Sequence, residues 1–247
     1  MNEGNSVPVA GWDFSWFEGR ATEERPSWGY ARMLGPRVAA SAAALDIQTG
    51  GGEVFAEVLS QSPAIPGVLA ATESWPPNIE IARQNLRPFG ASVLEVPDES
   101  VLPYSARTFD LISSRHPVVT VWDEIARVLK PGGIYLSQQV GVGSNQELTE
   151  FMMGGQAVDT ARSPERAAAQ AEAAGLVVVD LRQEALRTVF SDIGAVVYFL
   201  RKVLWTVPGF SVERYRGNLV RLHDLIERDG SFVSHAQRFL IEARKPG

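Results

Sequence analysis

Short apolar segments alternate with helical patterns along the middle of the chain. Runs rich in apolar or β-branched residues lie at about 43–48, 68–73, 92–96, 109–114 and 133–139. Their length is that of strands. Alternation of strands with helices is typical of βαβ units, so the pattern predicts a parallel sheet covered on both faces.

Helix signals occupy the intervals between these strands. Pro76-Pro77 suits a first helical turn, where a missing N–H has no cost, and apolar residues follow it at helical spacing. A second apolar stripe covers 122–129 and stops before Gly132-Gly133. A third, alanine-rich helix is predicted between Ser163 and Gly175, from their cap preferences.

The pattern changes near the C-terminal end. Segments 176–181 and 237–243 are predicted strands, and between them 191–205 and 212–226 have helical apolar patterns. We expect this helical insertion, at about 190–230, to cover the carboxyl ends of the strands, where ligands bind in open α/β folds. The alternative is that the two helices only complete the core.

Large aromatic side chains gather ahead of the first predicted strand, among charged residues. Leaving so many rings in water is costly, so this segment must pack on the protein. We expect residues 1–40 to form a helical lid over the cofactor cleft, and the alternative is a helix pair on the side of the sheet. The aromatic residues are Trp12, Phe14, Trp16, Phe17, Trp28 and Tyr30.

Composition narrows the class of protein. The 247 residues are 45% hydrophobic, enough for one buried core with an appended cap. A net charge of −6 and the absence of a basic run disfavour nucleic acid as a partner. The longest apolar run, 193–200, is far shorter than the ~20 residues of a membrane span. A cytoplasmic protein without a membrane partner is expected, and oligomeric state is left open.

Several chemistries are disfavoured by what the chain lacks. It has no cysteine, which excludes disulfides and thiolate ligands, and its three histidines are widely separated, so no metal site is predicted. There is no G-x-S-x-G elbow of a serine hydrolase.

A loop containing Gly50 and Gly52 follows the first predicted strand, and Glu73 ends the second. Glycine lets the backbone turn sharply and approach a ligand, and a carboxylate can accept hydrogen bonds from ribose hydroxyls. This layout is typical of a nucleoside-type cofactor site. The nicotinamide pattern fits less well, because Phe55 stands where its third glycine would be.

The order of motifs resembles the class I S-adenosylmethionine-dependent methyltransferases. The matching positions are Asp46, Gly50 and Gly52 of the first loop, Glu73, Asp98-Glu99 with Leu102-Pro103-Tyr104, and Phe109-Asp110-Leu111-Ile112. The resemblance covers about 40–140 and the last strand. It implies a Rossmann-like, doubly wound sheet of seven strands with the last antiparallel, in a methyltransferase domain over 41–247.

The resemblance also implies a reaction and roles for residues. The methyl group of S-adenosylmethionine would pass to an acceptor by in-line displacement, leaving S-adenosylhomocysteine. Glu73 would bind ribose, Ser74 and Trp75 would flank adenine, and Asp98 with Glu99 would contact its edge. Within the family, this chain resembles the small-molecule or uncharacterised bacterial branch.

Gln48 departs from the family pattern, because it stands where the first glycine is usual. It could narrow the methionine end of the pocket or hydrogen-bond the cofactor. A positive φ at this position would strain a glutamine.

The end of the fourth predicted strand should lie near the transferable methyl group. Ser114 is a predicted cofactor contact, and His116 is the candidate base if the acceptor must lose a proton, since imidazole titrates near neutrality. The alternative is that His116 only shapes a loop. Asp123 and Glu124 are other candidate bases, although acids also favour a helix start. Arg115, Tyr30 and Tyr198 are the candidate acceptor contacts.

Three functions therefore remain open. The first is methyl transfer to a small, uncharged and partly apolar molecule, and the second is methylation of ribosomal RNA. The third, which Gln48 motivates, is binding of S-adenosylmethionine without catalysis.

Overall fold

The chain folds into two compact units, in a computed structural model that describes residues 2–9, 14–158 and 160–247. Unit 1 comprises 1–25, 141–161 and 184–238, and unit 2 comprises 26–140, 162–183 and 239–247. Among the aromatic residues of the N-terminal segment, Trp12 lies outside the described residues. Each unit has its own core and is considered separately.

A single sheet has the strand order β1-β7-β8-β6-β5-β2-β3-β4. Its long strands β7 and β8 contribute residues to both units. The strands are Ala21–Glu23 (β1), Ala43–Asp46 (β2), Val68–Glu73 (β3), Ser92–Glu95 (β4), Phe109–Arg115 (β5), Leu129–Val140 (β6), Val177–Phe190 (β7) and Phe232–Arg244 (β8).

The centre of the sheet is parallel, as the alternating pattern predicts. β2 pairs in parallel with both β3 and β5, β3 with β4, and β5 with β6. Since β3 follows β2 on one side and β5 lies on the other, the strand order reverses at β2. Such a switch point leaves a crevice at the carboxyl ends of the strands, where ligands bind in doubly wound folds.

The last strand runs against its neighbour. Gly132 N donates to Lys245 O at the start of β6, and Gly141 N donates to Gln237 O just beyond its end. Residue numbers rise along one strand while they fall along the other, so β6 and β8 are antiparallel, which confirms the expected direction of the last strand.

The sheet has eight described strands where seven were expected. The additional strand is β1, whose residues Ala21–Glu23 pair with Thr188–Phe190 of β7. Three residues are too few to show a period of two, so the sequence pattern predicts no strand within the expected helical lid. β7 also continues to Phe190, well beyond the predicted 176–181, because the polar residues Arg182, Gln183 and Glu184 in its middle interrupt the apolar pattern.

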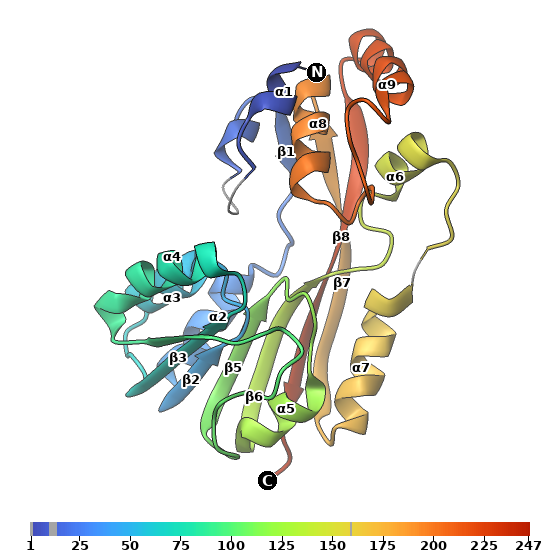
Figure 1. The fold of residues 1–247 in the computed structure, drawn as a ribbon. Coiled ribbons are helices and arrows are strands. Elements are labelled where there is room, and N and C mark those ends of the chain that lie inside the picture. The colour runs from blue at the N-terminus through green and yellow to red at the C-terminus, as the bar shows by residue number, and fades with distance from the viewer. Residues whose placement is uncertain (1, 10–13, 159) are drawn as a thin grey trace. The chain divides into compact units, whose positions relative to one another are not determined.

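Two helical layers cover the sheet in unit 2 (Figure 1). Buried residues of α2, α3 and α4 form one apolar cluster with β2, β3 and β5, and those of α5 and α7 form a second on the other face. These helices are Tyr30–Ala39 (α2), Glu53–Gln61 (α3), Pro76–Leu86 (α4), Trp122–Val128 (α5) and Pro164–Ala173 (α7), with a 3₁₀ turn at Arg87–Phe89. The doubly wound α/β class is therefore confirmed.

Unit 1 has a separate apolar core built mainly from α8, whose residues are nearly all buried. The predicted helix at 191–205 corresponds to α8 and that at 212–226 to α9. The helices are Asn2–Ser6 (α1), Gln146–Met153 (α6), Ile193–Lys202 (α8) and Arg216–Asp229 (α9), with 3₁₀ turns at Ser15–Phe17 and Thr160–Arg162.

Candidate active site

The glycine loop after β2 has the backbone conformation that its sequence predicts. Gly50 and Gly52 have φ of 63° and 76°, and Gly52 forms the N-cap of α3. The Asn85 side-chain amide of α4 donates to Gly51 O at 2.9 Å and holds the loop. A Cβ placed on Gly50 would meet no protein atom within 4 Å. The backbone there is open to a ligand, which fits the cofactor implied by the resemblance.

Glu73 organises this loop through its side chain. Its Oε2 accepts from Gly50 N at 2.7 Å, and its Oε1 accepts from Ser74 N and Trp75 N at 3.1 and 3.0 Å. Burial raises the pKa of Glu73, and these three N–H groups oppose the rise. A carboxylate offers roughly four acceptor positions. With the partners found among the described residues, one position, on Oε2, is left for a ligand hydroxyl.

Asp46, at the end of β2, faces the protein interior. Its two carboxylate oxygens accept from the hydroxyls of Thr49 and Ser113, both at 2.6 Å. Burial raises the pKa of Asp46 to about 6, although both hydroxyls act in the opposite direction. Asp46 therefore shapes the turn that starts the glycine loop and joins it to β5.

Gln48 adopts φ of 53°, so the strain expected for a non-glycine residue is present. Its side-chain amide makes two hydrogen bonds to one loop: Nε2 donates to Val119 O at 2.7 Å, and Oε1 accepts from Val118 N at 2.6 Å. The side chain therefore ties the glycine loop to the loop that follows β5. We name this pair of bonds the Gln48 clasp.

A narrow cleft lies beside the Gln48 clasp, within unit 2. Gln48, Asp98 and Ser114 are the predicted cofactor residues that line it. Asp98 is close enough to Glu73 to raise the pKa of that carboxyl. The remaining lining residues are Ile47, Thr72, Val96, Pro97, Ser100, Leu102, Pro117, Val119, Thr120, Val121, Glu124, Ile125 and Tyr135.

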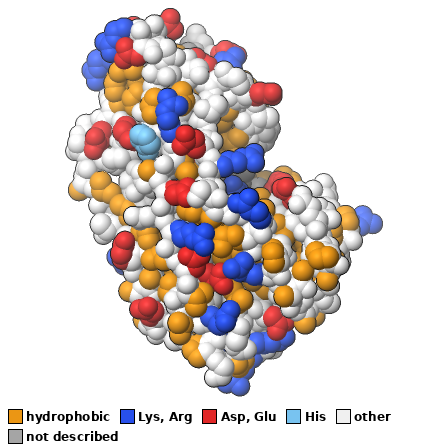
Figure 2. Space-filling view, turned by 180° about the vertical axis from the view of Figure 1, so that it is seen from behind, with side chains coloured by type: hydrophobic (Ala, Val, Ile, Leu, Met, Phe, Trp, Pro, Cys, Tyr) orange, Lys and Arg blue, Asp and Glu red, His pale blue; other side chains and the backbone are white. Residues whose placement is uncertain are grey.

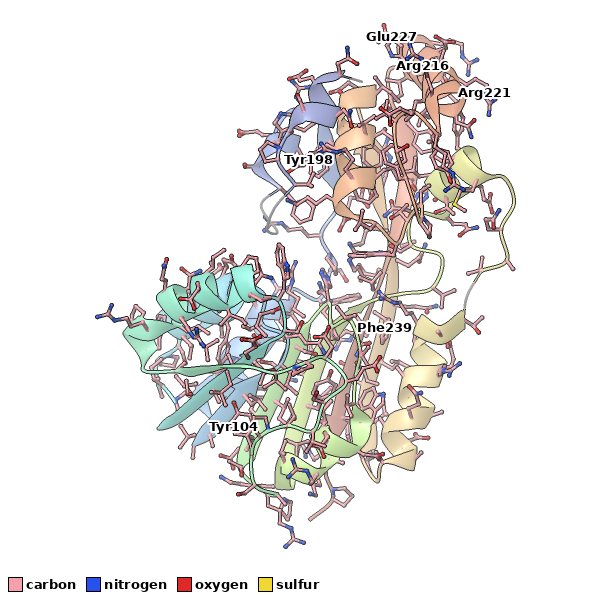
Figure 3. The ribbon with its side chains drawn as sticks, in the orientation of Figure 1. Tyr104, Tyr198, Arg216, Arg221, Glu227 and Phe239 are labelled. Carbon is pink, nitrogen blue, oxygen red and sulfur yellow. The ribbon has the colours of Figure 1, made fainter. Side chains whose placement is uncertain are left out.

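Two charged residues of α5 hold the segment after β4. Glu124 accepts from Leu102 N at 2.7 Å, while Arg127 donates to Leu102 O and to Tyr104 O. Glu124 and Arg127 also form an ion pair at 2.7 Å, which lowers the pKa of the Glu124 carboxyl. Glu124 is thus an anion that holds this segment in place, and its role as a base stays a prediction. Tyr104 lies on this same segment (Figure 3).

The carboxyl end of β5 contains a buried hydroxyl cluster. Ser114 Oγ lies 2.8 Å from Tyr135 Oη and 2.9 Å from Ser137 Oγ. The Tyr30 hydroxyl donates to Ser114 O at 3.0 Å, and burial raises the Tyr30 pKa well above its usual value. Tyr30 therefore positions the end of β5 from the start of α2.

His116, just beyond β5, has φ of 56° and is held by Gln138 at the end of β6. His116 N donates to Gln138 O at 2.7 Å, and the His116 Nε2 lies 2.9 Å from the Gln138 side-chain Nε2. Trp28 Nε1 donates to Gln138 Oε1 at 2.9 Å.

The other predicted site residues lie in different environments. Trp75 is 39% exposed. The predicted cofactor and acceptor residues that do not line the cleft include Asp46, Gly50, Gly52, Glu73, Ser74, Trp75, Glu99 and Arg115. Tyr198 belongs to unit 1 (Figure 3), where it is buried, packs against Trp16 and Phe17, and accepts from Lys202 Nζ at 3.3 Å. Roles of these residues toward a cofactor or an acceptor stay predictions.

Four residues important to this geometry were missed: Trp28, Asn85, Arg127 and Gln138. Gln138 left a signal in the sequence, because Gln138-Gln139 interrupts an apolar strand near its carboxyl end. The partners of Asn85 and Arg127 are backbone carbonyls of distant loops, which no local pattern marks.

Within the described ranges, no group of three or more potential metal-ligating side chains is present. The same residues include no helix that is both long and apolar enough to cross a bilayer.

Comparison with known proteins places these observations in context. Residues 45–137 match the profile of the family described as "Methyltransferase domain". No curated protein matches the chain.

Solved structures share the fold at low sequence identity. A protein of Bacillus halodurans C-125 assigned to the methyltransferases has TM-score 0.62 at 15% identity, over 90% of this chain and 99% of that one. The [4+2]-cyclase SpnF has TM-score 0.53 at 19% identity, over 87% and 79%. Phosphoethanolamine N-methyltransferase 2 of Haemonchus contortus, solved with S-adenosylhomocysteine, has TM-score 0.54 at 16% identity, over 89% and 53%.

Proposed function

We propose that this chain, a class I S-adenosylmethionine-dependent methyltransferase by its domain at residues 45–137, methylates a small molecule. The cofactor is S-adenosylmethionine. The glycine loop and Glu73 carry the proposal, because they combine an open backbone with a buried carboxylate at the switch point of the sheet. Gly50, Gly52, Glu73 and Asp98 would hold the adenosyl group.

Bound S-adenosylmethionine supplies a methyl group on a sulfonium: an acceptor lone pair bonds to that carbon while the carbon–sulfur electron pair remains on sulfur, giving S-adenosylhomocysteine. The leaving group is already good, so the protein contributes chiefly by positioning. Ser114 and the loop after β5 would orient the acceptor, since they line the cleft. The hydrogen bonds of Ser114 with Tyr135 and Ser137 would hold the start of the loop after β5 in place.

Two features favour a small and partly apolar acceptor. Many of the cleft-lining side chains are apolar, including Val96, Leu102, Val119 and Ile125. The net charge of −6 offers little attraction to the phosphates of RNA. The phosphoethanolamine enzyme acts on a small molecule by its name, which is consistent with this class of acceptor on the same fold.

Binding without methyl transfer is the second candidate. The Gln48 clasp favours it, because a glutamine side chain occupies the position where the family has glycine. SpnF, a [4+2]-cyclase by its name, has the same fold, so the fold by itself does not require methyl transfer.

Calorimetric titration with S-adenosylmethionine and S-adenosylhomocysteine tests the cofactor site. We expect binding to the unaltered protein and a loss of at least about tenfold in affinity for Glu73→Gln, which weakens both the loop and the ligand contact. Glu95→Gln is the matched control, because exposed Glu95 is the register partner of Glu73 on β4. No heat with either ligand at millimolar concentration would refute the cofactor site.

A panel of acceptors then separates the two functions. Production of S-adenosylhomocysteine with a small molecule, detected by mass spectrometry, supports methyl transfer. Tight binding with no turnover on any acceptor supports the second candidate.

A further inference from the structure

Three side chains from separate elements form one hydrogen-bonded row in unit 2. Trp28 precedes α2, Gln138 lies near the carboxyl end of β6 and His116 follows β5. Trp28 and Gln138 are only 4% and 3% exposed. The distances are 2.9 Å from Trp28 Nε1 to Gln138 Oε1 and 2.9 Å from Gln138 Nε2 to His116 Nε2. None of these contacts belongs to the cofactor residues discussed above.

The chemistry of the indole determines the polarity of this row. An indole N–H can only donate, so the amide atom that faces Trp28 must be the Gln138 oxygen. The other amide atom is then the NH₂ group, which can only donate. The His116 nitrogen opposite must therefore accept with its lone pair, and a neutral imidazole with its lone pair on Nε2 has its proton on Nδ1.

The main chain of the same glutamine fixes the position of the ring. His116 N donates to Gln138 O at 2.7 Å, and His116 adopts φ of 56°. A non-glycine residue in this region is strained by roughly 1–3 kcal/mol and persists only where its surroundings define it closely. Gln138 therefore holds His116 both through the backbone and through the side chain.

We propose that Gln138, oriented by Trp28, is a positioning residue that keeps His116 in the neutral tautomer protonated on Nδ1. Taking up a proton on Nε2 would direct that N–H against the Gln138 NH₂ group. In this tautomer Nδ1 is protonated and the Nε2 lone pair accepts from Gln138, so His116 does not act as a general base.

The identity of the acceptor follows in part, and this step rests on the proposed methyl transfer. The acceptor that fits is one that needs no proton removed by His116 before it attacks, such as a phenolate or carboxylate oxygen or a neutral amine. That lone pair forms the bond to the methyl carbon, the carbon–sulfur pair stays on sulfur, and an amine product releases its proton to solvent. No proton passes to His116.

Imidazole ¹⁵N NMR on the full chain measures the tautomer directly, because the two nitrogens differ clearly in shift and coupling when only one is protonated. The three histidines are separated by comparing the spectrum with that of His116→Gln. At a pH where the imidazole is neutral, we expect His116 to be protonated on Nδ1. Protonation on Nε2 would overturn the proposal.

Two variants test the cause. Gln138→Glu keeps the shape of the side chain, but its carboxylate can only accept, so the proton of His116 should move to Nε2. Gln139→Glu is the control, because the wild-type Gln139 amide contacts Thr120. In this control the proton of His116 should stay on Nδ1. An unchanged tautomer in Gln138→Glu would contradict the proposal. If Gln138→Glu does not fold, Trp28→Phe decides: loss of the indole donor should give a mixture of tautomers, and retention of pure Nδ1–H would overturn the role of Trp28.

These spectra need neither cofactor nor turnover. A protein that binds no S-adenosylmethionine can still show the expected tautomer, and a protein that binds it can show the other. Failure of this inference is therefore distinguishable from failure of the proposed function.

Discussion

At the scale of single residues, the candidate site combines features that oppose one another. Gly50 leaves the backbone open to a ligand, while Gln48, two residues earlier, uses its side chain to tie the loop after β5 to the glycine loop. Glu73 has one of roughly four acceptor positions left. Affinity for the cofactor should therefore depend on the free energy needed to break the internal hydrogen bonds of Gln48 and Glu73.

Gln48→Gly tests this balance. Glycine removes the positive-φ strain and the clasp together, so we expect cofactor affinity to rise by about tenfold by calorimetry. Unfolding free energy should change by less than about 1 kcal/mol, since relief of strain offsets two lost hydrogen bonds. Gln48→Asn separates the two effects, because asparagine tolerates positive φ but is too short for the clasp. Weaker binding in both variants would mean that Gln48 itself holds the cofactor.

Asp46 links the site to pH. Burial raises its pKa from the ordinary value of 3.8 to about 6 in the folded protein. Between these two pH values, the folded state therefore binds more protons than the unfolded state. Unfolding free energy therefore decreases as pH rises through that window, by about 3 kcal/mol from this group. Asp46→Asn should lack this contribution, and denaturant titrations at pH 4 and pH 7 measure it. An equal change in stability for both proteins would show that Asp46 is not the group concerned.

At the scale of elements, the site depends on loops that are held by side chains of distant helices. α5 holds the segment after β4 through Glu124 and Arg127, and α4 holds the glycine loop through Asn85. The loop after β5 is held by Gln48 and by Gln138. These contacts place three loops around one cleft.

Arg127→Gln tests the contribution of α5. It removes two donors to backbone carbonyls and the ion pair with Glu124, and leaves the Glu124 carboxylate without its partner. We expect a loss of about 1–3 kcal/mol in unfolding free energy by urea titration, with weaker cofactor binding. Arg83→Gln is the control, since the exposed Arg83–Glu80 pair should contribute under about 1 kcal/mol. Equal effects of the two variants would show that the contacts of Arg127 with the segment after β4 do not contribute to stability.

At the scale of the whole molecule, charge bears on the choice of acceptor. On the face that Figure 2 shows, acidic side chains are interspersed among basic ones, without a continuous basic surface. The net charge is −6 and the pI about 5.2. Both properties favour a small molecule over RNA.

RNA binding measured against salt concentration checks this choice. Because few counterions would be released, we expect no binding of a ribosomal RNA fragment at micromolar protein and about 150 mM salt. At lower salt concentrations, the affinity should change only weakly with salt. Lysozyme, a basic protein, serves as a positive control for non-specific binding. Tight binding with a steep salt slope would instead favour the ribosomal RNA enzyme.

The amino-acid sequence by itself determined the parallel centre of the sheet, the turn at Gly50 and Gly52, and the acid at the end of β3. These follow from local properties: the period of apolar residues, the conformational freedom of glycine, and the position of one side chain at a strand end. The match of residues 45–137 to the methyltransferase domain agrees with the motifs found in that range.

Only the tertiary structure decided which groups are already engaged. The sequence gives no sign that the Glu73 carboxylate has partners, yet it accepts from three backbone N–H groups, which leaves one of roughly four acceptor positions. The sequence marks His116 as a candidate base, and only the structure adds its contact with Gln138, whose amide oxygen accepts from Trp28. Such partners come from segments up to 110 residues away, and hydrogen bonds between distant segments leave no period in the chain. β1 was missed for a related reason, since three residues acquire strand character only by pairing with β7.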